Sequence, residues 1–350
     1  MNRRTASLGV AVVALTLLVG VVLLVPMPFV VMSPGLTENT IGSFEGEPVI
    51  VIEGAKTYPT SGRLDLTTVS VTSPDSDVRL PDVLNAWWSS DEIILPRDVV
   101  YPPEQTVQQV KQENQTQMLD SMDAAIAVGL AKVGVDAVKV TVEGVTPDAP
   151  ADGLLREGDE IVGVNSTTID STQAAVDAIS SLTPGSRVTL EIVRSGDSQD
   201  VEVTTAASPD DAAQSRVGVT LSDDFDPPFE VNIELGQEIG GPSAGLMFSL
   251  GIYDKLTPGE LTGGAHIAGT GTIDASGRVG EIGGIQQKIA GARDTGATIF
   301  LVPAGDCADV GSFAGDDEIR LVKVATMDDA VGALESLLVG DESAVEGCDA

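Results

Sequence analysis

The chain has 350 residues and a formal net charge of −34, from 53 acidic and 19 basic residues. This acid excess argues against nucleic acid as a partner, because there is no basic excess to neutralise phosphates. A hydrophobic content of 42% is enough for real cores, and the length allows two or three domains. The two cysteines and one histidine show no zinc-ligand spacing, so we predict no metal site.

The N-terminal residues favour a membrane anchor. The stretch from Leu8 to Val25 contains no charged residue, and a helix of that length spans ~27 Å, close to the hydrocarbon thickness of a bilayer. Arg3 and Arg4 precede it, so the positive-inside rule places the N-terminus in the cytoplasm. We therefore predict a cytoplasmic tip and transmembrane anchor at 1–32, with the rest of the chain outside the cell. A cleaved signal peptide is the alternative interpretation.

Residues 33–131 are predicted to form an extracytoplasmic segment of strands and helix. The runs Pro48–Ile52 and Leu64–Val71 are rich in β-branched residues, which predicts a strand for each. From Val107 to Leu130, apolar residues recur at roughly helical spacing. This spacing predicts a helix that packs against the protein or faces a partner.

Residues 132–205 show the pattern of a small α+β domain. Val138–Val142 alternates apolar and polar residues, and Arg187–Arg194 predicts a further strand. Between them, Ser171–Leu182 has helical spacing of apolar residues. Short strands with one helix in so few residues indicate a compact two-layer unit.

This domain resembles a PDZ domain. The resemblance depends on four motifs in order, Asp148-Ala149-Pro150-Ala151, Gly153-Leu154-Leu155, Gly158-Asp159-Glu160-Ile161 and Val164-Asn165. It implies that the domain captures extended peptide segments by strand addition, with a purely structural or gating role as the alternative. The polar, small-residue stretch that begins at Ala206 predicts a linker at 206–222. A last domain at 223–340 and a tail at 341–350 follow.

Ser243 is the first candidate for chemistry in the last domain. It lies within Gly240–Gly245, and a helix that begins near Pro242 would place it at the head of an apolar stripe. The glycines allow close backbone approach, and the free N–H groups of a first helical turn could stabilise an oxyanion. The alternative is a small residue that caps a core helix.

Lys288 is the second candidate. A helix that starts near Gly284 places Lys288 on the same face as Ile285, Ile289 and Ala292. Burial there would lower the pKa of the lysine, and a pKa of ~8 would leave about 10% of the amine neutral at pH 7. A neutral amine can take the proton of a serine hydroxyl. A solvated surface lysine is the alternative.

Residues 223–340 resemble the proteolytic domain of Lon proteases. The shared motifs are Gly241-Pro242-Ser243-Ala244-Gly245, Thr270-Gly271, Gly277-Arg278-Val279, Gly283-Gly284-Ile285 with Lys288, and Val302-Pro303. The resemblance implies that Ser243 is the nucleophile, Lys288 its general base and Thr270 a hydroxyl that orients the pair. It also implies a homo-oligomer, a ring of six. The sequence departs from the family at Gly240, where Lon enzymes often have an acidic residue.

With its anchor and PDZ domain, the whole chain resembles the membrane-anchored PDZ–Lon-like serine proteases of bacteria. The predicted fold class is α+β, with an N-terminal transmembrane helix, a small PDZ domain and a C-terminal α/β proteolytic domain. No Gly-x-x-x-x-Gly-Lys-Ser/Thr motif occurs, so we predict no ATPase and no cofactor.

The predicted function is an ATP-independent, membrane-anchored serine endopeptidase with a Ser–Lys dyad. It would be a single-pass cell-membrane protein whose extracytoplasmic catalytic domain degrades or processes extracytoplasmic or membrane-tethered proteins. The alternative is a non-catalytic PDZ scaffold with an inactive Lon-like domain. A Ser–His pairing would use His266, for which a surface or packing role is the preferred interpretation. Whether Cys307 and Cys348 form a disulfide stays open.

Overall fold

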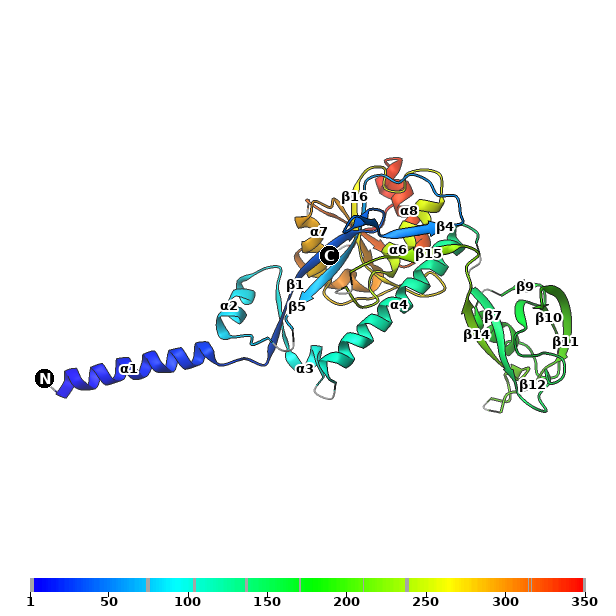
Figure 1. Cartoon of the computed structure of the whole chain (residues 1–350), viewed down its shortest axis with the longest axis horizontal. Coiled ribbons are helices and arrows are strands. Elements are labelled where there is room, and N and C mark those ends of the chain that lie inside the picture. The colour runs from blue at the N-terminus through cyan, green and yellow to red at the C-terminus, as the bar shows by residue number, and fades with distance from the viewer. Residues whose placement is uncertain are drawn as a thin grey trace. The chain divides into compact units, whose positions relative to one another are not determined.

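The computed structural model describes residues 3–348 except 74–75, 103–104, 136–137, 170, 210, 237–238, 314 and 316. The chain divides into two compact units, each considered by itself (Figure 1). The split unit comprises Met1–Val51, Thr57–Ala125 and Asn232–Ala350, and the inserted unit comprises Ile52–Lys56 and Ile126–Val231. Both units mix helices and strands.

Helix α1 (Arg3–Leu24) lies where the sequence predicts a membrane anchor. Among the described residues, none of the helices combines the length and the apolar character that a membrane crossing needs. The predicted transmembrane helix at 1–32 is therefore wrong. The fold class that included it, the single-pass cell-membrane localisation with an extracytoplasmic catalytic domain, and the membrane as a partner are corrected with it.

The split unit is built on a mixed sheet whose strands come from distant parts of the chain. The strand order is β20-β19-β16-β5-β1-β6. Strand β16 runs parallel to β5 and β19, whereas β1 runs antiparallel to β5 and β6. Strand β5 pairs with the much later β16, and β1 lies on the other side of β5 (Figure 1). The strands are β1 (Phe29–Asn39), β5 (Arg63–Val71), β6 (Ile93–Pro96), β16 (His266–Gly269), β19 (Ile299–Pro303) and β20 (Arg320–Val324).

Helices α6 and α7 form the core of the split unit with this sheet. Helix α6 (Gly245–Leu256) is apolar over most of its surface, and it is buried accordingly, with Phe248 fully inaccessible. On α7 (Ile285–Asp294), Ile289 packs in one cluster with Phe300 of β19. The other helices of this unit are α2 (Leu80–Trp88), α3 (Arg97–Val100) and α8 (Met327–Leu338), and α4 (Val107–Lys132) has residues in both units.

Gly284 fixes the start of α7. Its φ is +72°, a left-handed conformation that favours glycine, and an added Cβ would lie 2.8 Å from Cγ1 of Val69 on β5. Only glycine therefore allows α7 to begin this close to the sheet. The close contact at Gly284 therefore fixes the backbone of Lys288, one helical turn later, relative to β5.

Short elements complete the split unit and its boundary. They are β2 (Ser43–Phe44), β3 (Glu47–Pro48), β4 (Ile50–Glu53), β15 (Glu230–Ile233), β17 (Thr272–Ile273), β18 (Val279–Gly280) and the 3₁₀ turns η1 (Ala304–Asp309), η2 (Gly311–Phe313) and η3 (Glu342–Ala344). Both β4 and β15 have residues in each unit. A disulfide joins Cys307 in η1 to Cys348, with a Cα–Cα distance of 5.1 Å, and so ties the last described residue to the body of the unit.

The inserted unit is a second sheet covered by one helix. The strand order is β11-β10-β8-β7-β14, and the helix α5 (Thr172–Ser180) begins at Ser171, whose hydroxyl accepts a hydrogen bond from the Ala174 N–H. Its core includes Val142, Ile161 and Leu190. The strands are β7 (Val138–Val145), β8 (Glu160–Val164), β9 (Thr167–Thr168), β10 (Arg187–Arg194), β11 (Asp197–Thr204), β12 (Ala206–Ala207), β13 (Ser215–Arg216) and β14 (Val219–Phe225). The stretch interpreted as a linker thus contains short strands.

Candidate active site

Ser243 lies in a turn immediately before α6. The helix begins at Gly245 rather than near Pro242, so the hydroxyl of Ser243 precedes the first turn instead of heading it. Helix α4 holds this turn by two contacts. The Gly241 N–H donates to the Asn114 carbonyl at 3.0 Å, and Ser121 Oγ donates to the Pro242 carbonyl at 2.9 Å. The helix predicted at 107–130 therefore supports the turn that carries the candidate nucleophile.

The same packing gives a physical reason for the departure at Gly240. A Cβ added there would lie 3.2 Å from Cβ of Asn114, which is tighter than ordinary van der Waals contact. A side chain at this position would require Asn114 on α4 to shift by a few tenths of an ångström. Helix α4 occupies the space beside the turn and supplies the hydrogen bonds that hold it.

The structure brings Ser243, Lys288 and Thr270 together. Lys288 Nζ lies 2.7 Å from Ser243 Oγ and 2.9 Å from Thr270 Oγ1. Thr270 is fully buried, and its hydroxyl donates to the Ser243 carbonyl at 3.0 Å, which leaves its oxygen lone pairs directed to the amine. The Gly271 N–H donates to the same carbonyl at 2.9 Å. These contacts hold the amine and the serine hydroxyl in one geometry.

Burial changes the protonation of Lys288. The side chain is only 2% exposed, and removal from water lowers the pKa of its amine to about 8. The carboxylate of Asp306 acts in the opposite direction and raises the pKa of Lys288. At a pKa of about 8, roughly a tenth of the amine is neutral at pH 7. The group is therefore able to accept a proton near neutral pH.

Asp306 is a residue that sequence reasoning missed. It lies in η1, is 5% exposed, and accepts a hydrogen bond from the Ile282 N–H at 3.1 Å. Burial raises the pKa of this carboxyl group. The hydrogen bond holds the segment that leads into α7, and the charge acts on Lys288. No pattern marks a single aspartate in a chain with 53 acidic residues.

His266 has a different partner from Ser243. Its Nε2 lies 2.8 Å from Asp65 Oδ2, and Arg63 donates to the same fully buried carboxylate. Within the part of the chain that the structure describes, no hydrogen bond joins His266 to Ser243. The histidine therefore belongs to an ion-pair cluster at the start of β16.

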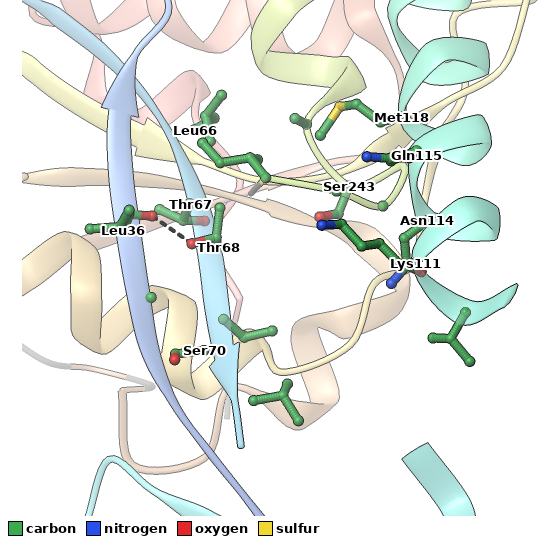
Figure 2. Close-up of a pocket in the computed structure, with 18 of the residues that line it drawn as sticks. Leu36, Leu66, Thr67, Thr68, Ser70, Lys111, Asn114, Gln115, Met118 and Ser243 are labelled. Atoms are coloured by element: carbon green, nitrogen blue, oxygen red, sulfur yellow. Dashed lines mark hydrogen bonds between the residues drawn. The ribbon is translucent and has the colours of Figure 1, made fainter. Parts of the chain in front are cut away.

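A cavity of about 620 Å³ opens beside the candidate nucleophile (Figure 2). Its walls are residues 67–71 of β5, part of β1, residues 107–118 of α4 and the turn that carries Ser243. The last pair between β5 and β16 is Leu66 with Gly269. Among the described residues, the following part of β5, residues 67–71, pairs with β1 alone. One edge of this strand therefore leaves backbone groups facing the cavity. The described residues contain no group of three His, Cys, Asp or Glu placed to hold a metal ion.

Comparisons with known proteins match two segments of the chain. Residues 106–205 match the PDZ domain family, and residues 236–338 match the Lon protease (S16) C-terminal proteolytic domain. A Lon protease of Clostridioides difficile is 31% identical over 117 residues, which cover 31% of this chain and 15% of that protein. Lon protease 2 of Herpetosiphon aurantiacus is 34% identical over 93 residues, which cover 26% of this chain and 11% of that protein.

Among solved structures, the PDZ domain of the SdrC-like protein of Listeria monocytogenes is 25% identical and has a TM-score of 0.22. The match covers 25% of this chain and 87% of that one. The chain spans only a small part of the curated relatives it matches. The family matches confirm the two resemblances seen in the sequence. Residues 106–205 are thus similar to a PDZ domain, and residues 236–338 are similar to the proteolytic domain of Lon proteases, which supports a serine peptidase.

Proposed function

We propose that the chain is an ATP-independent serine endopeptidase in which Ser243 is the nucleophile, Lys288 the general base and Thr270 a positioning residue. The observation that carries this proposal is the 2.7 Å separation of Lys288 Nζ and Ser243 Oγ at a site where the lysine is 2% exposed. A charged, solvated lysine could not take the serine proton near neutral pH, whereas a buried one can.

The chemistry follows from this arrangement. The neutral amine of Lys288 takes the proton of Ser243 Oγ as the oxygen attacks the carbonyl carbon of the peptide bond. The protonated amine then gives that proton to the leaving nitrogen, which releases one product and leaves an acyl group on Ser243. The Leu246 N–H donates to the Gly271 carbonyl and the Phe248 N–H donates to the Ala244 carbonyl, so the proposed donors for the oxyanion are the N–H groups that precede them, at the turn of Ser243. Water then hydrolyses the acyl group by the same proton route.

Substrate binding is proposed at the edge of β5. The segment from Thr67 to Val71 lines the cavity and pairs with β1 alone in the described chain. An extended peptide can add to such an edge through main-chain hydrogen bonds, whatever its sequence. That binding mode suits a protease for unfolded or extended segments. The PDZ match suggests further peptide binding in the inserted unit, which we propose recruits such segments.

ATP independence has support from the sequence alone. No Gly-x-x-x-x-Gly-Lys-Ser/Thr motif is present to hold a nucleotide phosphate. A homo-oligomer is part of the proposal because the Lon resemblance implies one. Size-exclusion chromatography with light scattering measures the assembly directly.

The test is cleavage of an unfolded protein by the full chain, with and without ATP and Mg²⁺. We expect equal rates in both conditions. Ser243→Ala and Lys288→Ala should each lower the rate by about 10³-fold or more. Ser249→Ala and Lys255→Ala are matched controls on α6, outside the candidate dyad, and should keep the wild-type rate.

Two outcomes contradict the proposal. Full activity in Lys288→Ala would remove the lysine from the mechanism. Absence of cleavage by the wild type across a broad set of unfolded proteins would favour a non-catalytic scaffold. Circular dichroism of each variant separates loss of chemistry from loss of fold.

A further inference from the structure

The cavity beside Ser243 has an unusual charge for this chain. The sequence carries 53 acidic residues, yet none of the described residues that line the cavity is Asp or Glu. The two charged lining residues are Lys111 and Lys288. In a molecule with a net charge of −34, the lining of this cavity thus carries basic side chains and no acidic one, although Glu281 lines a second pocket that shares Ser243 and Lys288.

Lys111 is the lysine that the proposed chemistry does not use. Lys288 is buried and bonded to Ser243 and Thr270, whereas Lys111 is exposed on α4 and extends into the cavity (Figure 2). Within the described part of the chain, Lys111 has neither an ion-pair nor a hydrogen-bond partner. By contrast, Lys323 is paired with Glu346 at 2.8 Å. The amine of Lys111 is thus available to a ligand.

Lys111 also faces the proposed path of a substrate. The cavity lies between α4 on one side and the end of β5 on the other, with the turn of Ser243 at its base. A peptide that adds to β5 passes in front of α4 and directs alternate side chains away from the plane of the sheet. Lys111 shares one face of α4 with Asn114 and Met118, which also line the cavity.

We infer that Lys111 is a specificity-determining residue, which selects substrate segments that carry an acidic side chain close to the scissile bond. This inference rests on the proposed peptidase activity. An amine without an internal partner gains an ion pair only when the substrate supplies a carboxylate. A basic substrate side chain at the same position would be repelled.

The expected effect is modest and dependent on salt. A solvent-exposed ion pair favours the correct substrate by about fivefold at most. The screening length falls from ~10 Å at 0.1 M salt to ~3 Å at 1 M, so the preference should weaken across that range. Lys288 is unchanged in every variant at position 111, so its charge contributes equally to the rates that are compared.

The test uses a set of fluorogenic peptides that differ only in one residue. Glu, Gln or Lys is placed in turn at each position from four before to four after the cleaved bond. With wild type, kcat/KM should be about fivefold higher for Glu than for Gln at one or two positions. Lys111→Gln should remove that preference, and Lys111→Glu should reverse it in favour of Lys. Arg187→Gln, an equal loss of charge at an exposed site on β10, should leave the profile unchanged.

The same peptides are bound to Ser243→Ala and to Ser243→Ala/Lys111→Glu, with affinity measured by fluorescence anisotropy. Wild-type cleavage with a flat profile, or a profile that Lys111→Glu does not alter, overturns the inference and leaves the proposed function standing. If wild type cleaves no peptide, the proposed function fails, and the binding experiment decides the role of Lys111. Tighter binding of the Glu peptides that Lys111→Glu reverses supports the inference, and equal affinities for the Glu, Gln and Lys peptides overturn the inference.

Discussion

The two units of the chain differ in what they bury. Among the described residues, the inserted unit buries an apolar core with few polar groups, and its buried acid, Asp159, is paired with Arg194 at 2.6 Å. The split unit buries many more polar side chains, namely Thr40, Asp65, Thr67, Ser121, Ser249, Asp254, Thr262, Thr270, Gln287, Lys288 and Asp306. Burying a polar group costs free energy unless a partner is supplied.

The two units also differ in how far along the chain their contacts reach. The inserted unit is nearly continuous in sequence and depends on contacts between neighbouring strands. The split unit assembles its candidate site from α4, the turn at Ser243, the end of β16 and α7. Within that site, burial lowers the pKa of Lys288 to about 8.

Loss of the disulfide should weaken the split unit alone. Replacing Cys307 and Cys348 together by Ala removes a cross-link with a sequence separation of 41. We expect the free energy of unfolding of this unit to fall by about 4 kcal/mol, because the unfolded chain gains conformational freedom. Hydrogen exchange with mass spectrometry measures the protection of backbone amides in both units in one sample. An equal loss of protection in strands β7 to β11 would show that the units are not independent.

Loss of core volume in the inserted unit should lower the stability of that unit and leave the split unit unchanged. Leu190 on β10 is fully buried, and Leu190→Ala should lower the stability of that unit by about 2–5 kcal/mol. Val176→Ala, at an exposed position on α5, is the control and should stay within about 0.5 kcal/mol. Cleavage of short peptides should be unchanged in both variants. A parallel loss of peptide cleavage in Leu190→Ala would contradict the separation of the two units.

The rate of peptide cleavage should rise with pH through the pKa of Lys288. Because the neutral amine is the active form and its pKa is about 8, the rate at pH 8 should be roughly fiftyfold that at pH 6. A pH profile of kcat/KM measures the midpoint. Asp306→Asn removes a charge that raises the pKa of Lys288, so its midpoint should move to lower pH. A flat profile across this range would exclude lysine as the base.

The hydrogen bond from α4 to the turn of Ser243 should have a smaller effect. Ser121→Ala removes the bond to the Pro242 carbonyl, a loss of about 1 kcal/mol, so kcat should fall by about fivefold. Thr116→Ala is the matched control, because its hydroxyl bonds only to the Gln112 carbonyl of the same helix. Equal kcat values for the two variants would mean that α4 does not position the turn.

Local patterns predicted much of what lies within one segment. The apolar stripes around Ser243 and Lys288, and the strands and helix of residues 138–194, have counterparts in the structure because periodicity depends on near neighbours. The pairing of β5 with β16 was not predictable, since no local signal reports on a partner so far along the chain. Asp306 and the hydrogen bonds from α4 were missed for the same reason. The transmembrane prediction depended on a single uncharged run, and among the described residues no helix is both long and apolar enough to cross a membrane.

The split sheet has a consequence for synthesis on the ribosome. Thr67 Oγ1 donates to the Gly269 carbonyl across 202 residues of chain. At 5–20 residues per second, the partner of β5 emerges roughly 10–40 s after β5 itself. Residues 126–231 leave the ribosome whole within that interval, so we expect the inserted unit to fold first. The part of β5 that pairs with β16 stays open until β16 emerges, so we expect the candidate site to assemble only after the inserted unit has left the ribosome.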